Sequence, residues 1–230
     1  FYYTEASFIL PSINMSEGDL LAIALAAKAS EQYRGTPLAG KLDRAFKRLA
    51  EMLPERISVK PELLALRFSF TGNPSKPVNA KIWESVTRGV LTQCSVKIDY
   101  RSIQSRQLKT RLIDPCHIAN LQGEWYVFAY CHVAKKIIQL AIPRIQSALL
   151  TERHFDLPAD WDADKCLATT FGRFCSNKGA QKVRLLFDKE LAPWLQERHW
   201  HPQQKLKELP DGNFELSFSA AGMFEVYRWV

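Results

Sequence analysis

The stretch 94–150 most constrains the fold, because short runs of alternating side chains follow one another at close spacing. Val96, Ile98 and Tyr100 alternate with polar neighbours, which is the pattern of a strand with one buried face. Three further runs have the composition of strands: 108–113, 124–130 and 137–142. Several short strands joined by tight turns predict a small, strongly bent sheet or a barrel.

The run that begins at Glu124 is bulky on both sides. Aromatic or branched side chains occupy most positions from Trp125 to Tyr130, so we expect this strand to be covered on both faces of its sheet. We expect Trp125 in the core, since aromatic side chains of this size supply much of the burial in a small domain. The orientation of Tyr126 stays open. Gly123, directly ahead of the run, belongs to a hairpin turn signal.

Most of the net charge of +7 lies in this predicted sheet. Residues 91–150 carry 8 Lys+Arg against 3 Asp+Glu, whereas 1–90 carry 12 against 9 and 151–230 carry 11 against 12. A basic surface with interleaved aromatic side chains suits an anionic ligand that contains bases, because Arg binds phosphate through paired hydrogen bonds and aromatic faces stack on bases. The same cations could instead simply solvate exposed strand positions.

The remaining segments predict an α+β protein of one to three compact units. Ser16 is a candidate N-cap for a helix that extends to about Glu31. Two more helices are predicted at 38–52 and 78–92, and a strand at 57–70. Beyond an acidic connector, a β-α-β-β-α order predicts a small sandwich, with these elements: strand 183–187, helix 189–196, strands 205–209 and 214–218, and a final helix at 222–230.

Five cysteines, an odd number without any C-x-x-C pair, argue against a disulfide scaffold and for a reducing cytoplasm: Cys94, Cys116, Cys131, Cys166 and Cys175. Two of them precede a histidine, at His117 and His132. Adjacent strand residues point to opposite faces, so neither pair chelates zinc easily, and no metal or cofactor is expected. No run of the sequence approaches the length of a membrane span, so no membrane partner is expected. Because the sequence shows no signal peptide and does not begin with Met, we expect it to be part of a longer cytoplasmic protein.

The segment from Arg111 to Ile145 resembles the WYL domain of bacterial transcriptional regulators, a sensor of nucleic-acid-like ligands. The resemblance rests on three blocks in order: Pro115-x-His117, Trp125-Tyr126-Val127 and Ile142-Pro143-Arg144-Ile145. Valine for the leucine that gives the family its name keeps an apolar strand position. The resemblance implies a small Sm-like or SH3-like barrel over 78–150.

The same resemblance extends over most of the chain. Residues 1–77 resemble the last wing strand of a winged helix-turn-helix, followed by a helical linker that contributes to dimerisation. An independent N-terminal strand and a plain helical hairpin are the alternatives. Residues 151–177 are predicted to be a connector, and 178–230 resemble the C-terminal extension that follows WYL domains. An N-terminal DNA-binding module would then be missing from this chain.

The resemblance implies a ligand contact for Arg144, to phosphate or carboxylate. The family more often has an Asp where Pro143 stands, so a possible orienting partner for the arginine is lost. The full set of predicted ligand-binding residues is Arg144, Arg111, His117, Tyr100, Arg101, Ser102 and Tyr126. Arg111 and His117 would flank a turn at Asp114-Pro115 and face the same side as Arg144. A surface Arg, a structural His and a core Tyr are the alternative interpretations.

A second basic and aromatic cluster occurs in the C-terminal part, where Arg198, His199 and His201 surround Trp200. This cluster could extend a ligand channel. More often, such residues cap a helix or form an interdomain contact.

The leading hypothesis is the effector-sensing and dimerising part of a bacterial DNA-binding transcriptional regulator. Its expected partners are a nucleotide or single-stranded nucleic-acid effector, a second copy of the chain, and operator DNA through the missing module. The alternative is a protein-interaction or oligomerisation module without a small ligand. Catalysis is not expected, because the basic segment has only Asp99, Asp114 and Glu124 as carboxylates and the chain lacks the G-x-S-x-G, H-E-x-x-H and P-loop spacings.

Overall fold

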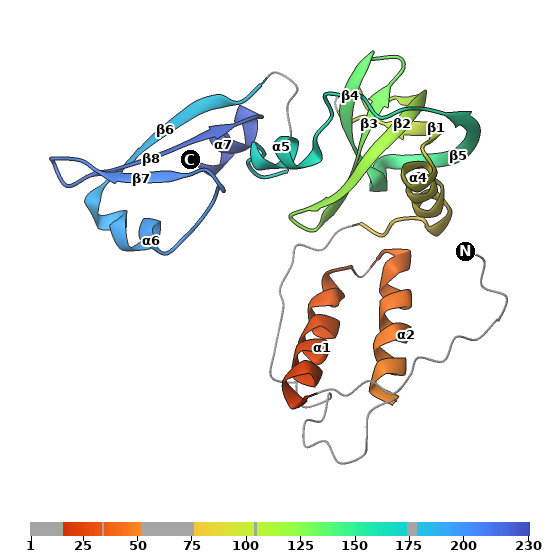
Figure 1. Ribbon diagram of the computed structural model, residues 1–230. Coiled ribbons are helices and arrows are strands. Elements are labelled where there is room, and N and C mark those ends of the chain that lie inside the picture. Colours follow the sequence, from red (N-terminus) through yellow and green to blue (C-terminus); the bar gives the residue numbers. More distant parts are fainter. Residues whose placement is uncertain (1–15, 34, 52–75, 104, 174–178) are drawn as a thin grey trace. The chain divides into compact units, whose positions relative to one another are not determined.

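The computed structural model describes residues 16–33, 35–51, 76–103, 105–173 and 179–230. The chain divides into two compact units, Phe1–Pro74 and Ser75–Val230 (Figure 1). The aromatic N-terminal segment and the strand expected at 57–70 lie outside the described residues. In the described part of the chain, no helix is both long and apolar enough to cross a membrane.

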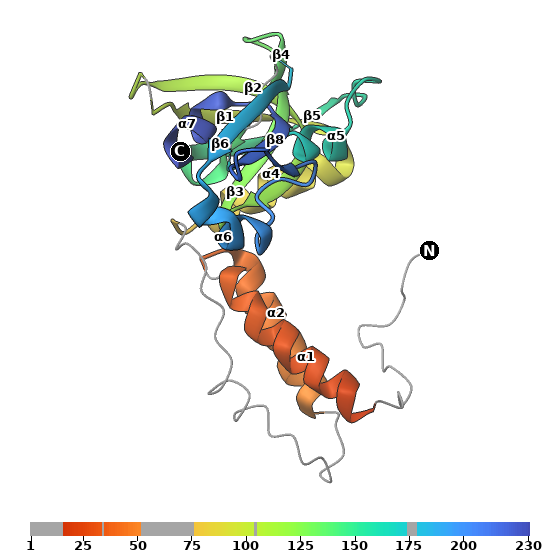
Figure 2. The same cartoon turned by 90° about the vertical axis from the view of Figure 1, so that its left-hand side faces the viewer.

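The first unit contains two helices, at the positions that the sequence predicts. Its described elements are α1 (Glu17–Ala29), the 3-10 turn η1 (Ser30–Tyr33) and α2 (Pro37–Glu51), and the two helices lie side by side in both views (Figures 1 and 2). Ser16 caps α1 through a capping box with Asp19: each side chain accepts a hydrogen bond from the other residue's backbone N–H. The predicted N-cap is therefore confirmed.

The second unit begins with α4 (Ala80–Thr92) and a five-stranded antiparallel sheet. Its strands lie in the order β4-β3-β2-β1-β5. Their bounds are β1 (Cys94–Arg101), β2 (Leu108–Leu121), β3 (Glu124–Cys131), β4 (Lys136–Ala141) and β5 (Ile145–His154).

The sheet is not a closed barrel, so that part of the predicted fold is wrong. Closure would require pairing between the edge strands β4 and β5, and the described residues show none. The 3-10 turn η2 (Ile142–Arg144) directly follows β4 and leads the chain across to β1, where β5 pairs instead. Five strands therefore form an open sheet with α4 packed on it.

The position of the Asp114-Pro115 step also differs from the prediction. This step lies inside β2, which continues from Leu108 to Leu121 rather than turning. A register shift between Pro115 and His117 marks an irregularity in the pairing with β3. A strand can accommodate proline at such a bulge because no ladder hydrogen bond is lost there.

The core of this domain forms where α4 meets the sheet. Ile82, Trp83 and Val86 are buried on α4, and Trp83 contacts Trp125 edge-on at a ring distance of 4.8 Å. The predicted core position of Trp125 is therefore confirmed. Every residue of β3 from Trp125 to Ala129 is buried, which confirms the expectation that this strand is covered on both faces.

The segment after β5 contains the short helix α5 (Ala163–Ala168), capped by Asp162, whose side chain accepts from the Lys165 backbone N–H. Cys166 in this helix is disulfide-bonded. The cysteine pattern argued against a disulfide scaffold, and this one bridge departs from that expectation because spacing in the sequence carries no signal for a bridge that the fold forms. Cys94, Cys116 and Cys131 are free and buried.

The C-terminal part has the predicted β-α-β-β-α order. Its elements are β6 (Gln181–Phe187), η3 (Lys189–Leu191), α6 (Ala192–Gln196), β7 (Lys205–Glu208), β8 (Phe214–Ala220) and α7 (Met223–Trp229). The sheet order is β6-β8-β7, with β8 in the centre. Alternate residues of β8 are buried in a cluster that also includes Phe171 and Val226. Gly212, with φ +82°, turns the β7–β8 hairpin.

Candidate ligand-binding site

Tyr126 on β3 is buried, and its hydroxyl donates to the Glu124 carboxylate at 2.7 Å. Burial is the main cause that raises the pKa of Tyr126, and the bond to Glu124 acts in the same direction. The positive charges of Arg144 and Arg173 oppose this rise. The hydroxyl therefore stays protonated near neutral pH and is available only as a neutral hydrogen-bonding group.

Arg144 lies close to Tyr126 because the pairing of β3 with β4 places it there. Tyr126 pairs with Ala141, the last residue of β4. The η2 turn follows at once, with Pro143 at its start and Arg144 at its end. The guanidinium is half-buried, and its charge acts on the Tyr126 hydroxyl. No carboxylate among the described residues pairs with Arg144.

Tyr100 and Arg111 form a second pair beside the first. The Tyr100 hydroxyl accepts from the Ala141 backbone N–H at 3.4 Å, and the Arg111 guanidinium lies 5.9 Å from the centre of the Tyr100 ring. Arg111 Nη1 donates weakly to Cys131 Sγ at 3.8 Å, while its Nε is buried without a hydrogen-bond partner. In the parts of the chain that the structure describes, this guanidinium also has no ion-pair partner.

Ala141 connects the two pairs, because it lies opposite Tyr126 and donates to Tyr100. We call Tyr100, Arg111, Tyr126 and Arg144 the arginine–tyrosine group. It contains two guanidinium groups without a carboxylate partner and two buried phenol rings. Such a set offers charged donors to an anion and aromatic edges or faces to a ring.

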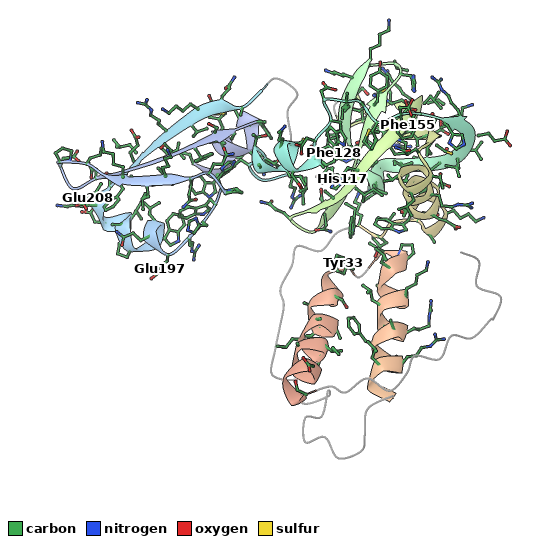
Figure 3. The ribbon with its side chains drawn as sticks, viewed as in Figure 1. Tyr33, His117, Phe128, Phe155, Glu197 and Glu208 are labelled. Carbon is green, nitrogen blue, oxygen red and sulfur yellow. The ribbon has the colours of Figure 1, made fainter. Side chains whose placement is uncertain are left out.

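His117, Arg101 and Ser102 have other surroundings. His117 lies opposite Phe128 in the β2–β3 pairing, with ring centres 6.2 Å apart, and the two side chains lie close together in Figure 3. Arg101 is exposed at the end of β1. The Ser102 backbone N–H donates to the Gln107 carbonyl at 3.4 Å in the β1–β2 connection. Among the described residues, no side-chain hydrogen bond, ion pair or ring contact joins these three residues to the arginine–tyrosine group.

Two residues outside the predicted ligand-binding set, Glu124 and Arg173, lie beside Tyr126. Glu124 pairs with Arg173 at 3.1 Å, with both side chains about 30% exposed, and Gln139 Nε2 donates to the Arg173 carbonyl at 2.6 Å. The sequence held a signal for Glu124, because residues two apart on a strand share a face. It held none for Arg173, which lies far along the chain and reaches β3 only through the fold.

A buried polar cluster occupies the middle of the same sheet. Asp114 accepts from Ser95 Oγ at 2.6 Å and contacts His132 Nε2 at 2.8 Å. Cys116 Sγ donates to the Asp114 carbonyl, and burial raises the pKa of the Cys116 thiol. A thiol with a raised pKa is a poor nucleophile. The described residues contain no group of three or more His, Cys, Asp or Glu side chains that could hold a metal ion.

The basic and aromatic cluster near Trp200 divides into two parts. Arg198 lies over the Trp194 ring at 5.2 Å, near the surface. His201 instead is almost fully buried and stacks on Phe218 at 5.1 Å. Its Nδ1 accepts from the Gln203 backbone N–H, and burial lowers its pKa. His201 therefore belongs to the core of the C-terminal sheet.

Comparison with known proteins agrees with this architecture. Residues 81–150 match the WYL domain model and residues 179–230 match the WCX domain model. The chain is thus a tandem protein in which a WCX domain follows a WYL domain. It belongs to the WYL-domain family of transcriptional regulators.

One similar solved structure is proteasome accessory factor B/C (PafBC) of Arthrobacter aurescens. It has 13% sequence identity and a TM-score of 0.41, over 94% of this chain and 30% of that one. This chain therefore spans about a third of the length of that protein. No curated protein matches the sequence significantly.

Proposed function

We propose that this chain is the effector-sensing and dimerising part of a bacterial DNA-binding transcriptional regulator. The proposed effector is a nucleotide or single-stranded nucleic acid, bound by the arginine–tyrosine group of the WYL domain. One observation carries the proposal: two half-buried arginines, Arg111 and Arg144, lie near two buried tyrosines and have no carboxylate partner among the described residues. Membership in a family of regulators supports the class of function.

The chemistry of the group fits an effector that carries both phosphate and base. A guanidinium binds a phosphate oxygen pair through parallel hydrogen bonds, and it keeps its charge at any physiological pH. Arg111 is held by the Tyr100 ring and by Cys131, so little side-chain freedom is lost when an anion binds. Tyr126 stays neutral, and a neutral phenol does not repel an anionic ligand as a phenolate would.

Regulation would follow from linkage. An effector that binds one arrangement of the domains more tightly than another shifts the population toward the first. The spacing of two DNA-binding modules in a dimer must match the spacing of operator half-sites. A modest change in the dimer would therefore change operator affinity in the complete regulator.

Fluorescence anisotropy of labelled single-stranded DNA and RNA oligonucleotides, across a salt series, tests the proposal on the full 230-residue chain. Arg144→Ala should weaken binding about tenfold or more, as expected for loss of a charge-assisted contact. Arg153→Ala is the matched control, because Arg153 is exposed near the opposite end of β5 from Arg144. Oligonucleotide binding by the wild type and by both variants should weaken as the salt concentration rises. Equal affinity of the two variants would contradict the proposal.

The second candidate is a protein-interaction module without a small ligand. Phe224 and Tyr227 on α7 are 63% and 76% exposed, which is unusual for side chains of this size. Sedimentation alone does not separate the two candidates, since both predict self-association. Arg144→Glu does separate them. Loss of oligonucleotide binding with unchanged sedimentation favours the effector-sensing role. If the variant keeps both the binding and the sedimentation of the wild type, the interaction module is favoured.

A further inference from the structure

A pocket of about 440 Å³ lies in the second unit, where Gln122 of the β2–β3 turn and Arg173 meet residues of the C-terminal part. The arginine–tyrosine group does not line it, although Arg173 pairs with Glu124, which accepts from the Tyr126 hydroxyl. Sites for small molecules typically have volumes of about 300–1,000 Å³. Its lining includes Phe171, Gly172, Trp200, Glu225, Arg228 and Trp229. This size suits a compact ligand, and the lining offers it both charged groups and aromatic rings.

Three aromatic rings form one continuous wall of the pocket. Trp229 lies 5.5 Å from Phe171 in an edge-on contact and 5.3 Å from Trp200 in a tilted one. All three rings also belong to, or pack against, the core of the C-terminal sheet. The wall is therefore held in place before any ligand binds, which reduces the entropy lost on binding. Indole faces are good stacking surfaces for nucleobases.

Three charged side chains line the same pocket, and one of them, Arg173, is already paired with Glu124 at 3.1 Å. The other two carry opposite charges and do not pair with each other. Glu225 and Arg228 both come from α7, and neither has an ion-pair partner among the described residues. Arg228 lies 5.8 Å from the Phe224 ring centre. A ligand that carries hydrogen-bond donors at one end and an anion at the other would satisfy both charges.

Gly172 allows the Glu225 carboxylate to lie against the main chain. Its φ is +74°, and a Cβ there would come within 2.7 Å of Glu225 Oε2. A side chain at this position would therefore displace the carboxylate from the pocket lining. Because Gly172 has no side chain, the Glu225 carboxylate remains beside the aromatic wall as a hydrogen-bond acceptor.

We propose that this pocket binds a free guanine nucleotide, with its base stacked on the tryptophan wall, its donor edge on Glu225 and its phosphate near Arg228. Guanine has ring N–H and amino donors side by side, so a carboxylate can accept from both. Adenine and cytosine place an acceptor nitrogen beside their amino group, and this nitrogen repels a carboxylate. The proposal does not depend on the effector proposed for the WYL domain.

Isothermal titration calorimetry of the full chain with guanosine monophosphate tests this site, with adenosine monophosphate, guanosine and inorganic phosphate as comparison ligands. Glu225→Gln should lower the affinity for guanosine monophosphate at least about tenfold, because it removes a charged acceptor and keeps the shape of the side chain. Glu208→Gln is the matched control. Glu208 is exposed on β7 and pairs with Phe214, at the end of the sheet remote from α7 (Figure 3). This control should change affinity by less than about threefold.

Arg228→Gln gives a second, independent readout. Arg228 is exposed, so the variant should fold. It should lower the affinity for guanosine monophosphate more than the affinity for guanosine. Equal binding of adenosine monophosphate, or binding of inorganic phosphate alone with the same affinity, would overturn the proposal. Absence of any guanosine monophosphate binding would also overturn it.

The Arg144→Ala variant separates this site from the proposed effector site. If the pocket binds the nucleotide, Arg144→Ala should retain guanosine monophosphate binding even where it loses the oligonucleotide. Loss of guanosine monophosphate in Arg144→Ala but not in Glu225→Gln would place the nucleotide on the WYL domain and overturn the inference. If the wild type binds guanosine monophosphate but no oligonucleotide, the inference about the pocket stands and the proposed effector site on the WYL domain does not.

Discussion

Glu124 at the start of β3 and Arg173 after α5 form an ion pair of 3.1 Å. The same carboxylate accepts the hydroxyl of Tyr126, a residue of the arginine–tyrosine group. A tyrosine within the diagnostic Trp-Tyr-Val run is therefore connected, through one carboxylate, to the segment that leads to the WCX domain. This contact links the proposed effector site to a neighbouring part of the chain.

Loss of the Tyr126 hydroxyl should cost stability. Tyr126→Phe removes the 2.7 Å bond to Glu124 and should lower the free energy of unfolding by about 1–2 kcal/mol. Tyr130→Phe, on the same strand, is the control, because the Tyr130 hydroxyl has no hydrogen-bond partner in the described residues. Urea unfolding of both variants is the measurement, and equal losses would show that the bond contributes nothing.

The buried carboxylate of Asp114 predicts a strong effect of a conservative change. Ser95→Ala removes one of its two side-chain partners, and a buried polar group that loses a partner costs about 1–3 kcal/mol. Ser147→Ala removes a bond of the same length, 2.6 Å, to the Asp99 carboxylate. That bond is exposed to water, so we expect a loss below about 0.5 kcal/mol. Chemical denaturation of the two variants compares the contribution of a buried hydrogen bond with that of an exposed one of the same length.

Close packing of α4 on the sheet predicts opposite effects of one substitution at two glycines. A Cβ on Gly89 would lie 2.6 Å from the Val96 Cγ2 atom and 3.0 Å from the Cys94 carbonyl oxygen. Gly89→Ala should therefore destabilise by about 1–3 kcal/mol through overpacking. A Cβ on Gly40 in α2 would meet only Arg44 Nη1, at an ordinary contact distance of 3.9 Å, so Gly40→Ala should stabilise its helix by up to about 1 kcal/mol. Thermal melts followed at 222 nm would contradict the account if both changes had the same sign.

His201 predicts that the C-terminal sheet loses stability in mild acid. Burial lowers its pKa in the folded state, whereas the unfolded chain binds the proton near pH 6.5. Above about pH 6.5 both states are neutral and the full stability is present. As the pH falls below this value, the unfolded state binds more protons, so the free energy of unfolding decreases until the folded-state pKa is reached.

Hydrogen exchange of the β8 amides between pH 7.5 and pH 5, corrected for intrinsic exchange rates, measures this loss. His201→Gln should flatten the pH dependence because the side chain no longer titrates. His199→Gln, at an exposed position, should leave it unchanged. A wild-type profile without pH dependence would mean that His201 does not control the stability of this sheet.

Periodicity along the chain was enough to predict most elements of this fold. The helices at α1, α2 and α4, the strand alternation in β1 and the β-α-β-β-α order follow from local pattern. Periodicity did not predict the features that depend on pairing between strands distant in the sequence. The sheet would be closed only if β5 paired with β4 as well as with β1, and the local alternation of side chains carries no signal for that second pairing.

The candidate site shows the same limit. Tyr126 and Arg144 belong to motifs that are visible in the sequence, and the β3–β4 register places them together. Arg173 has no sequence signal, because its contact with Glu124 depends on the path of the chain after α5. The disulfide at Cys166 likewise depends on how the chain folds rather than on residue spacing. Contacts between distant segments were therefore the part that sequence reasoning could not supply.

Photocrosslinking tests the central claim most directly. A single-stranded oligonucleotide that carries 4-thiouridine is irradiated with the full chain, and the crosslinked peptides are mapped by mass spectrometry. If the arginine–tyrosine group binds the effector, crosslinks should fall within 124–131 and 141–145, the segments that contain Tyr126 and Arg144, and should be lost in Arg144→Ala. Crosslinks confined to other segments, with the same yield in wild type and variant, would contradict the assignment of the WYL domain as the effector site.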